Sequence, residues 1–153
     1  MGLFSFLKNA GAKLFGHKAE KNDEESKIDK IIALKEAVLG LELPITDFDV
    51  DIEGDNVKVF GQVESQEVRE KVILTLGNVE GVATVTDEIR VILPEPEAVF
   101  YEVKSGDSLS KISKVHYGDA MKYNIIFEAN KPMLKDVNLI YPGQVLRIPA
   151  LKD

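Results

Sequence analysis

Two prolines within three residues divide this chain. Residues 94–98 read PEPEA, and proline continues neither a helix nor a central strand, because it lacks a backbone N–H and its φ angle is fixed. A second polar stretch, GHKAEKNDEE at 16–25, follows a short apolar leader. We expect an N-terminal segment with a polar linker at 1–23, a middle domain at 24–93, a linker at 94–98 and a C-terminal domain at 99–153. Because the 153 residues include no cysteine, each small domain must be stabilised by packing without disulfide bonds.

Most of the charge lies in the middle of the chain. Residues 20–98 carry 20 acidic and 8 basic side chains, a net charge of −12, whereas residues 1–19 sum to +3 and residues 99–153 to +2. Nucleic acids require clustered Lys and Arg, so we expect no nucleic-acid partner. No apolar run approaches the roughly 20 residues of a membrane helix. We therefore expect no transmembrane segment, no secretion signal and a cytoplasmic location.

The middle domain switches from helical to strand periodicity. Apolar residues recur at helical spacing over 28–39, behind Ser26, which we take as the N-cap of a helix that ends near Gly40. Apolar and polar residues then alternate strictly over 47–53, and after a Gly-Asp-Asn turn comes a second run rich in valine over 57–63. This pattern predicts a β-hairpin with one face in water.

A second helix and a closing strand complete this domain. Ser65 is a predicted N-cap, Gly77 a predicted helix stop, and apolar residues over 82–91 predict a strand. The resulting order, αββαβ, together with the segment GNVEGVATV, resembles a BON domain over residues 24–93.

Acidic residues along the hairpin raise the question of calcium. Asp47, Asp49 and Asp51 recur at period two, and from Asp49 the sequence matches the opening of an EF-hand loop. The twelfth position of that loop is Phe60, however, where calcium requires a bidentate Glu. We therefore interpret these carboxylates as the solvent face of a strand and predict no calcium site.

The C-terminal domain carries a second recognisable pattern. An opening strand leads into a Ser-Gly-Asp turn, Asp107 or Ser108 caps a helix that Gly118 ends, a second helix follows, and a closing strand covers 145–148. This order, βααβ, with the segments VKSGD and IYPGQVLRIP, resembles a LysM domain. The sequence thus predicts an α+β protein of two small domains, BON then LysM.

The LysM resemblance implies a glycan groove. Domains of this family bind N-acetylglucosamine polymers such as peptidoglycan in a shallow groove between the first turn and the segment before the last strand. By resemblance the groove would use Gly106, Asp107, Ser108, Ile140, Tyr141 and Pro142. The alternative is that these residues are only helix caps and turn formers, and that the domain is a packing module.

The leader is amphipathic. Leu3, Phe6, Leu7, Ala10 and Leu14 fall on one face of a helix, so we expect a short N-terminal helix. Its three lysines favour docking onto the acidic middle domain, with a membrane surface as the alternative.

The combination of a short amphipathic leader, a BON domain and a terminal LysM domain resembles a family of bacterial potassium-binding proteins. The resemblance rests on this architecture and on the segments MGLFSF, AGAKLF and FEANKPMLK. It implies selective binding of K⁺, a conformational response and contact between the two domains. The alternative function is that of an accessory protein which binds peptidoglycan through LysM.

Given that resemblance, we expect main-chain oxygens to bind the ion. K⁺ is large and singly charged, and neutral carbonyl oxygens replace its hydration shell better than carboxylates do. Carbonyls are available where helices end or break, as at the turn after Gly77 and around Gly11. We nominate the oxygens of Leu7, Ala10, Ala12, Gly77, Val79 and Val82. The alternative for the turn is a plain helix stop.

We predict no enzyme. His17 and His116 are isolated from any carboxylate spacing that would form a metal site or a proton relay, and no glycine-rich phosphate loop follows a strand. Apart from K⁺, no cofactor or catalytic residue is expected.

Overall fold

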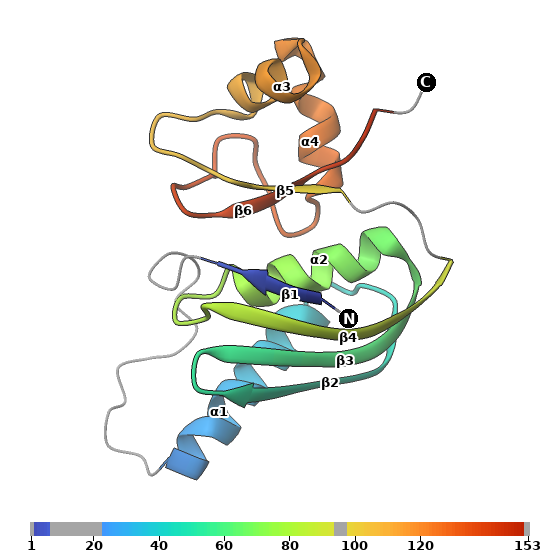
Figure 1. Ribbon diagram of the computed structural model, residues 1–153, viewed down its shortest axis with the longest axis vertical. Helices are drawn as coiled ribbons and strands as arrows, with labels where there is room; N and C mark the ends of the chain where they lie inside the picture. The colour runs from blue at the N-terminus through green and yellow to red at the C-terminus, as the bar shows by residue number, and fades with distance from the viewer. Residues whose placement is uncertain (1, 7–22, 94–97, 152–153) are drawn as a thin grey trace.

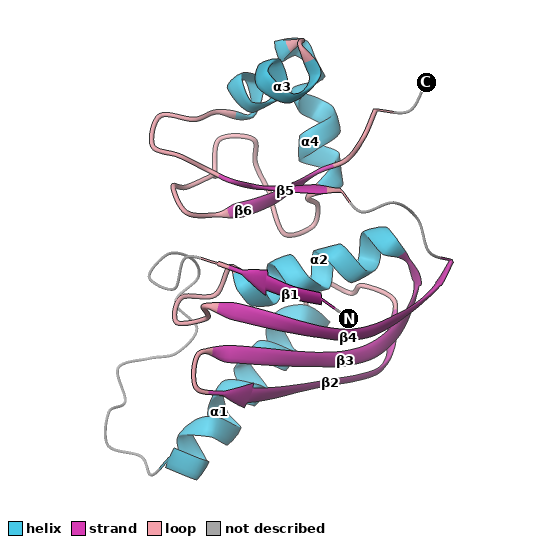
Figure 2. Cartoon of the chain, viewed as in Figure 1, coloured by secondary structure: helices cyan, strands magenta, loops and turns pink. Residues whose placement is uncertain are grey.

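The computed structural model describes residues 2–6, 23–93 and 98–151. The described residues form both helices and strands, as Figure 2 shows, and the strands lie in two separate sheets, so the α+β prediction is confirmed. In Figure 1, helix α2 lies between the larger sheet and the C-terminal region, and it contacts both.

The first region has the predicted αββαβ order. Its elements are α1 (Asp23–Leu39), β2 (Ile45–Glu53), β3 (Asn56–Ser65), α2 (Gln66–Gly77) and β4 (Thr84–Leu93). The sheet order is β1-β4-β3-β2, in which β3 and β4 are parallel and the two outer pairs are antiparallel. Parallel neighbours need a crossover connection, and α2 supplies it.

One face of this sheet forms the core. Alternate residues of the strands, including Val50, Val59 and Val85, are buried against Leu34 of α1 and Leu76 of α2. Full burial of such a side chain stabilises the fold by about 1.5–3 kcal/mol. The two helices therefore cover one face of the sheet, and the acidic residues of β2 lie on the other.

Helix boundaries were predicted unevenly. Ser65 caps α2 as expected, because its side-chain oxygen accepts a hydrogen bond of 3.3 Å from the Val68 N–H. The predicted start of α1 was wrong, because the helix begins at Asp23, three residues before the expected cap Ser26.

The predicted N-terminal helix is wrong where the structure describes it. Residues Gly2–Ser5 form β1, which pairs antiparallel with residues 84–87 of β4. Leu3 is exposed and Phe6 is buried. The aromatic residues Phe4 and Phe6 follow a period of two, and pairing with the edge of β4 supplies the backbone hydrogen bonds that a helix would otherwise provide. Residues 7–22 lie outside the described residues.

The C-terminal region follows the βααβ order. It consists of β5 (Val99–Glu102), α3 (Leu109–Tyr117), a 3₁₀ turn η1 (Ala120–Lys122), α4 (Tyr123–Ala129) and β6 (Val145–Ile148). Of the two candidate caps, Ser108 accepts the bond from the Lys111 N–H at 3.2 Å. Gly118 ends α3 with a φ of 76°, a conformation that favours glycine.

The two regions are joined by a buried ion pair. Glu70 of α2 and Arg147 of β6 are both buried, and the Arg147 Nε donates to Glu70 Oε1 at 2.9 Å. The other Glu70 oxygen accepts from the Ala98 N–H at 3.0 Å. Val145 of β6 belongs to the same apolar core as α2.

Candidate functional site

The turn after α2 brings three of the nominated oxygens close together in the chain. The Asn78 N–H donates to Leu74 O at 2.9 Å and the Val82 N–H donates to Val79 O at 3.2 Å. The side chains of Val79 and Val82 are buried in the core. Among hydrogen bonds between described residues, none is accepted by the carbonyl oxygens of Gly77 or Val82.

Phe6 fixes the end of β1 at this turn. Its N–H donates to Ala83 O at 2.8 Å, and its ring lies so close to Gly77 that an added Cβ there would overlap the ring. Glycine at 77 is therefore required for this packing. Leu7, Ala10 and Ala12 lie outside the described residues, but Leu7 is the residue directly after Phe6.

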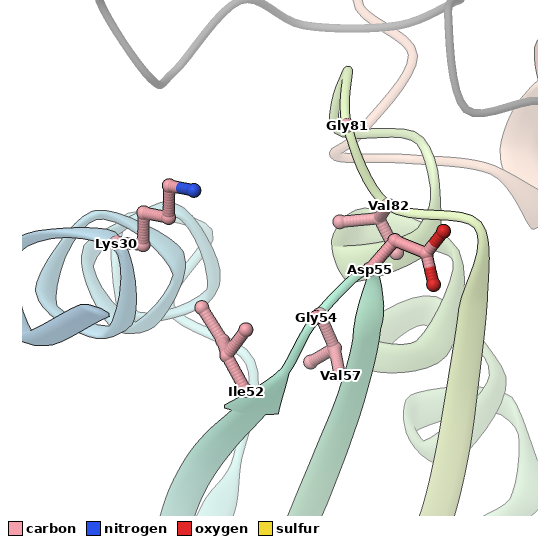
Figure 3. Close-up of a pocket in the computed structure, with 7 residues that line it drawn as sticks. All are labelled: Lys30, Ile52, Gly54, Asp55, Val57, Gly81 and Val82. Atoms are coloured by element: carbon pink, nitrogen blue, oxygen red, sulfur yellow. The ribbon is translucent and has the colours of Figure 1, made fainter. Parts of the chain in front are cut away.

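A cavity of about 460 Å³ borders the turn on its other side. Figure 3 shows Lys30 of α1 on one side of the cavity, and the hairpin turn with the Asp55 carboxylate and Val82 on the other. The backbone carbonyl of Asp55 accepts hydrogen bonds from the Ala83 and Thr84 N–H groups, at 2.9 and 3.3 Å. The cavity walls are Lys30, Ile52, Gly54, Asp55, Val57, Gly81 and Val82.

The acidic strand β2 is organised differently. Asp49 Oδ1 accepts from the Val50 N–H at 2.9 Å, and Asp51 Oδ1 accepts from the Ile52 N–H, also at 2.9 Å. Lys27 lies 3.3 Å from the same Asp51 oxygen. The hydrogen bond from Ile52, followed by the Lys27 ammonium, holds the pKa of the Asp51 carboxyl below its usual 3.8. Within the described ranges, no group of three or more His, Asp or Glu side chains is placed to hold a metal ion.

The two segments of the predicted glycan groove lie next to each other. Val103 links them, because its N–H donates to Gln144 O and its carbonyl accepts from the Gly143 N–H, each at 2.8 Å. Gly106, Asp107 and Ser108 follow on one side of this link. Ile140, Tyr141 and Pro142 precede it on the other.

Asp107 holds the first of these turns in shape. Its carboxylate accepts from the Tyr101 hydroxyl at 2.6 Å and from the Lys104 N–H at 2.8 Å. The Tyr101 bond, and then the Lys104 bond, lower the pKa of Asp107. The hydrogen bond between Tyr101 and Asp107 also raises the pKa of Tyr101 to about 12. Asp107 thus has a structural role in the turn and does not cap α3.

The residues that connect the turn to the C-terminal region were not predicted from the sequence. The Asn78 Nδ2 donates to Val145 O and its Oδ1 accepts from the Val145 N–H, both at 2.8 Å. The Tyr141 hydroxyl lies 3.5 Å from Asn78 O. An asparagine directly after a helix-ending glycine was the available signal, but its partner is 67 positions away in the chain.

Comparison with known proteins agrees with this architecture. The sequence matches the BON domain family at residues 27–92 and the LysM domain family at residues 101–149. The chain is therefore a two-domain protein that combines two kinds of binding domain.

The chain belongs to the family of the potassium binding protein Kbp, as the resemblance predicted. It is 45% identical over 150 residues to Potassium binding protein Kbp of Escherichia coli O6:H1, a match that covers 97% of this chain and 99% of that protein. An uncharacterized protein of Deinococcus radiodurans is 52% identical over 50 residues, 33% of this chain and 19% of that protein. Among the described helices, none has the length and apolar character needed to span a bilayer.

Proposed function

We propose that this chain binds K⁺ selectively through backbone carbonyls and changes conformation when it does so, in the cytoplasm. The proposed ligands are the main-chain oxygens of Leu7, Ala10, Ala12, Gly77, Val79 and Val82. The name of the relative from Escherichia coli and the family membership support K⁺ as the ion. K⁺ is the bound ligand of the protein and takes part in no reaction.

The observation that carries this proposal is the position of Phe6. Its N–H is bonded to Ala83 O and its ring packs on Gly77, so the chain continues into residue 7 beside the turn at 77–82. The last described residue before the leader ligands therefore lies against the turn that carries the other three. An ion that binds both groups would join two segments that are about 70 residues apart in the sequence, which accounts for a conformational response.

The chemistry of the donors favours K⁺ over divalent ions. Peptide carbonyls are neutral, and several of them match the weak, large hydration shell of K⁺. Mg²⁺ and Ca²⁺ bind sites with carboxylate ligands, and the carboxylates of Asp49 and Asp51 are bonded to their own strand and to lysines. The proposed site therefore contains no charged ligand.

Thermal unfolding in matched KCl and NaCl tests this function. A ligand that binds only the native state adds roughly 2.7 kcal/mol of stability at about 100 times its dissociation constant. We expect a higher melting temperature in KCl than in NaCl at the same ionic strength. Identical melting curves in the two salts would contradict the proposal.

A second candidate function is binding of peptidoglycan or another N-acetylglucosamine polymer through LysM. The bonds between Val103 and the segment 143–144 favour it, because they bring both halves of the predicted groove together. Cosedimentation with insoluble peptidoglycan or chitin tests it directly. A glycan binder would cosediment in NaCl as well as in KCl, which separates this function from ion binding.

A further inference from the structure

Among the described strands β6 pairs with β5 alone, and two asparagine side chains cover its second, free edge. On the other edge β6 pairs with β5, from Glu102 opposite Val145 to Val99 opposite Ile148. On the free edge the backbone of Val145 exchanges two hydrogen bonds of 2.8 Å with the amide of Asn78. The backbone of Arg147 exchanges bonds of 2.8 and 2.9 Å with the amide of Asn130. Each amide takes the place of a residue in a neighbouring strand.

The two asparagines differ in where they come from. Asn130 directly follows α4 and belongs to the same domain as β6, so its bonds close that domain upon itself. Asn78 directly follows α2 and belongs to the BON domain. Its side chain therefore bonds one domain to the strand edge of the other.

Asn78 is also the residue between two proposed potassium ligands. The Gly77 carbonyl belongs to the same planar peptide unit as the Asn78 nitrogen, and that nitrogen donates to Leu74 O at 2.9 Å. The next peptide unit carries Asn78 O, which lies 3.5 Å from the Tyr141 hydroxyl, and the nitrogen of Val79. The C-terminal domain thus contacts Asn78 at its side chain and at its carbonyl.

We propose that Asn78 is a positioning residue for potassium binding. The edge of β6, through the amide of Asn78, fixes the backbone path from Gly77 to Val79 and so the direction of two of the proposed ligand oxygens. The LysM domain then contributes to ion binding by restraining the turn, although none of its atoms contacts the ion. This inference rests on the proposed function for its ligand, but the restraint on the turn exists without the ion.

Neighbouring contacts make such a restraint effective. The buried pair of Glu70 and Arg147 joins the same two elements, α2 and β6, with two N–O distances of 2.9 Å. Val145 is itself packed in the core that contains Leu76 and Val79. Strand β6 is therefore held against α2 at several points, and Asn78 connects it to the turn itself.

Asn78→Ala and Asn130→Ala form a matched pair for the test. Both remove one amide from the same edge of the same strand, but only the first touches the turn. Each full-length variant is titrated with KCl and NaCl by calorimetry, and its melting temperature is recorded. Because the turn loses both hydrogen bonds to β6, we expect Asn78→Ala to weaken K⁺ binding by about tenfold or more. We expect the K⁺ affinity of Asn130→Ala to stay within about threefold of the wild type, even if this variant lowers the melting temperature as much as Asn78→Ala does.

Hydrogen exchange in NaCl makes the test independent of the ion. We expect the Val79 and Val82 amides to exchange faster in Asn78→Ala than in the wild type, and at wild-type rates in Asn130→Ala. If the wild type shows no response to KCl but this difference in exchange is present, the proposed function fails and the positioning role stands. Equal exchange in the two variants, or K⁺ affinities that follow only the loss of melting temperature, would overturn the positioning role.

A second pair covers the case in which either alanine variant does not fold. Asn78→Asp and Asn130→Asp each keep an oxygen that accepts the strand N–H and replace the donor to the strand carbonyl by a second oxygen, which is charged when the carboxyl is ionised. The same ranking is expected, and the opposite ranking would overturn the proposal.

Discussion

Strand β2 and the turn at 77–82 are two regions of one domain that both present oxygens, and they use them in opposite ways. The carboxylates of Asp49 and Asp51 are charged and exposed, but each accepts a bond from the backbone of its own strand and lies near a lysine. The carbonyls of Gly77 and Val82 are neutral, and within the described residues they accept no bond. If K⁺ binds at the turn as proposed, its ligands are neutral oxygens and not the carboxylates of the most acidic strand.

The backbone bonds of β2 also explain why its acidic residues are there. Val50 and Ile52 direct their N–H groups toward the side-chain oxygens of the residues before them, and β2 is one of the two outer strands of the sheet. An outer strand with unpaired N–H groups is prone to pair with other chains. The aspartates cover these groups and add charge, so their pattern serves the strand.

Deletion of residues 2–15 is expected to reduce K⁺ binding more than any other change considered below. It removes β1 and three of the six proposed ligands and leaves β2 intact. We expect calorimetric titration with KCl to show no saturable heat, while the tyrosine signals of the LysM domain in near-ultraviolet circular dichroism persist. Undiminished titration heats would show that the leader is not part of the site.

Gly77→Ala is expected to act nearly as strongly through a single methyl group. The new Cβ overlaps the Phe6 ring, so Phe6 must move away from the turn, at a cost of about 1–3 kcal/mol for such overpacking. We expect K⁺ to bind more than about tenfold more weakly in a chain that still folds. Gly118→Ala is the control: it adds strain at a φ of 76° in the LysM domain, where no atom lies within 4 Å of the new Cβ. Loss of binding in both variants to the same extent would argue against a role for Phe6.

Strand β2 and the turn at 77–82 also differ in their expected response to pH. The pKa of Asp51 is lowered in the folded chain, so its ionised form stabilises the fold above the ordinary pKa of 3.8, and this contribution is lost as the pH falls through the lowered pKa. We expect the melting temperature of the wild type to exceed that of Asp51→Asn slightly at pH 7, and the gap to close below pH 3.8. Peptide carbonyls do not titrate in this range, so K⁺ affinity should not follow the gap. A K⁺ affinity that falls together with the gap would assign the ion to β2.

The smallest expected effect is that of Asp49→Asn combined with Asp51→Asn. Their long-range attraction for a cation is screened by salt, so K⁺ affinity should stay within about threefold of the wild type. Calorimetry at 0.15 M ionic strength, held with NaCl, measures this. A loss of binding in a folded double variant would show that carboxylates coordinate the ion.

Local signals in the sequence predicted most of the elements. The hydrophobic periods and the cap at Ser65 identified α2 and the hairpin, because these features depend on neighbouring residues. The predicted N-terminal helix was wrong because residues 2–6 are too few to separate a period of two from a helical stripe. Only pairing with the edge of β4, 79–85 positions away, decides between them.

The candidate site was less accessible from the sequence. The turn at 77–82 stands out through its two glycines, but its choice as an ion site depended on a resemblance to a known family. The bonds of Asn78 to Val145 and of Glu70 to Arg147 join residues 67 and 77 positions apart. Such pairs leave no local pattern, because they follow from the docking of two domains.

Carbon-13 NMR of the carbonyl groups during a KCl titration tests directly whether main-chain oxygens bind the ion. The shifts of the Gly77, Val79 and Val82 main-chain carbonyls should move saturably with KCl and stay unchanged in an equal series of NaCl. The side-chain carboxyl signals of Asp49 and Asp51 should stay unchanged in both series. Saturable shifts at these carboxyls, with the three carbonyls unmoved, would contradict the account and place the ion on the acidic strand.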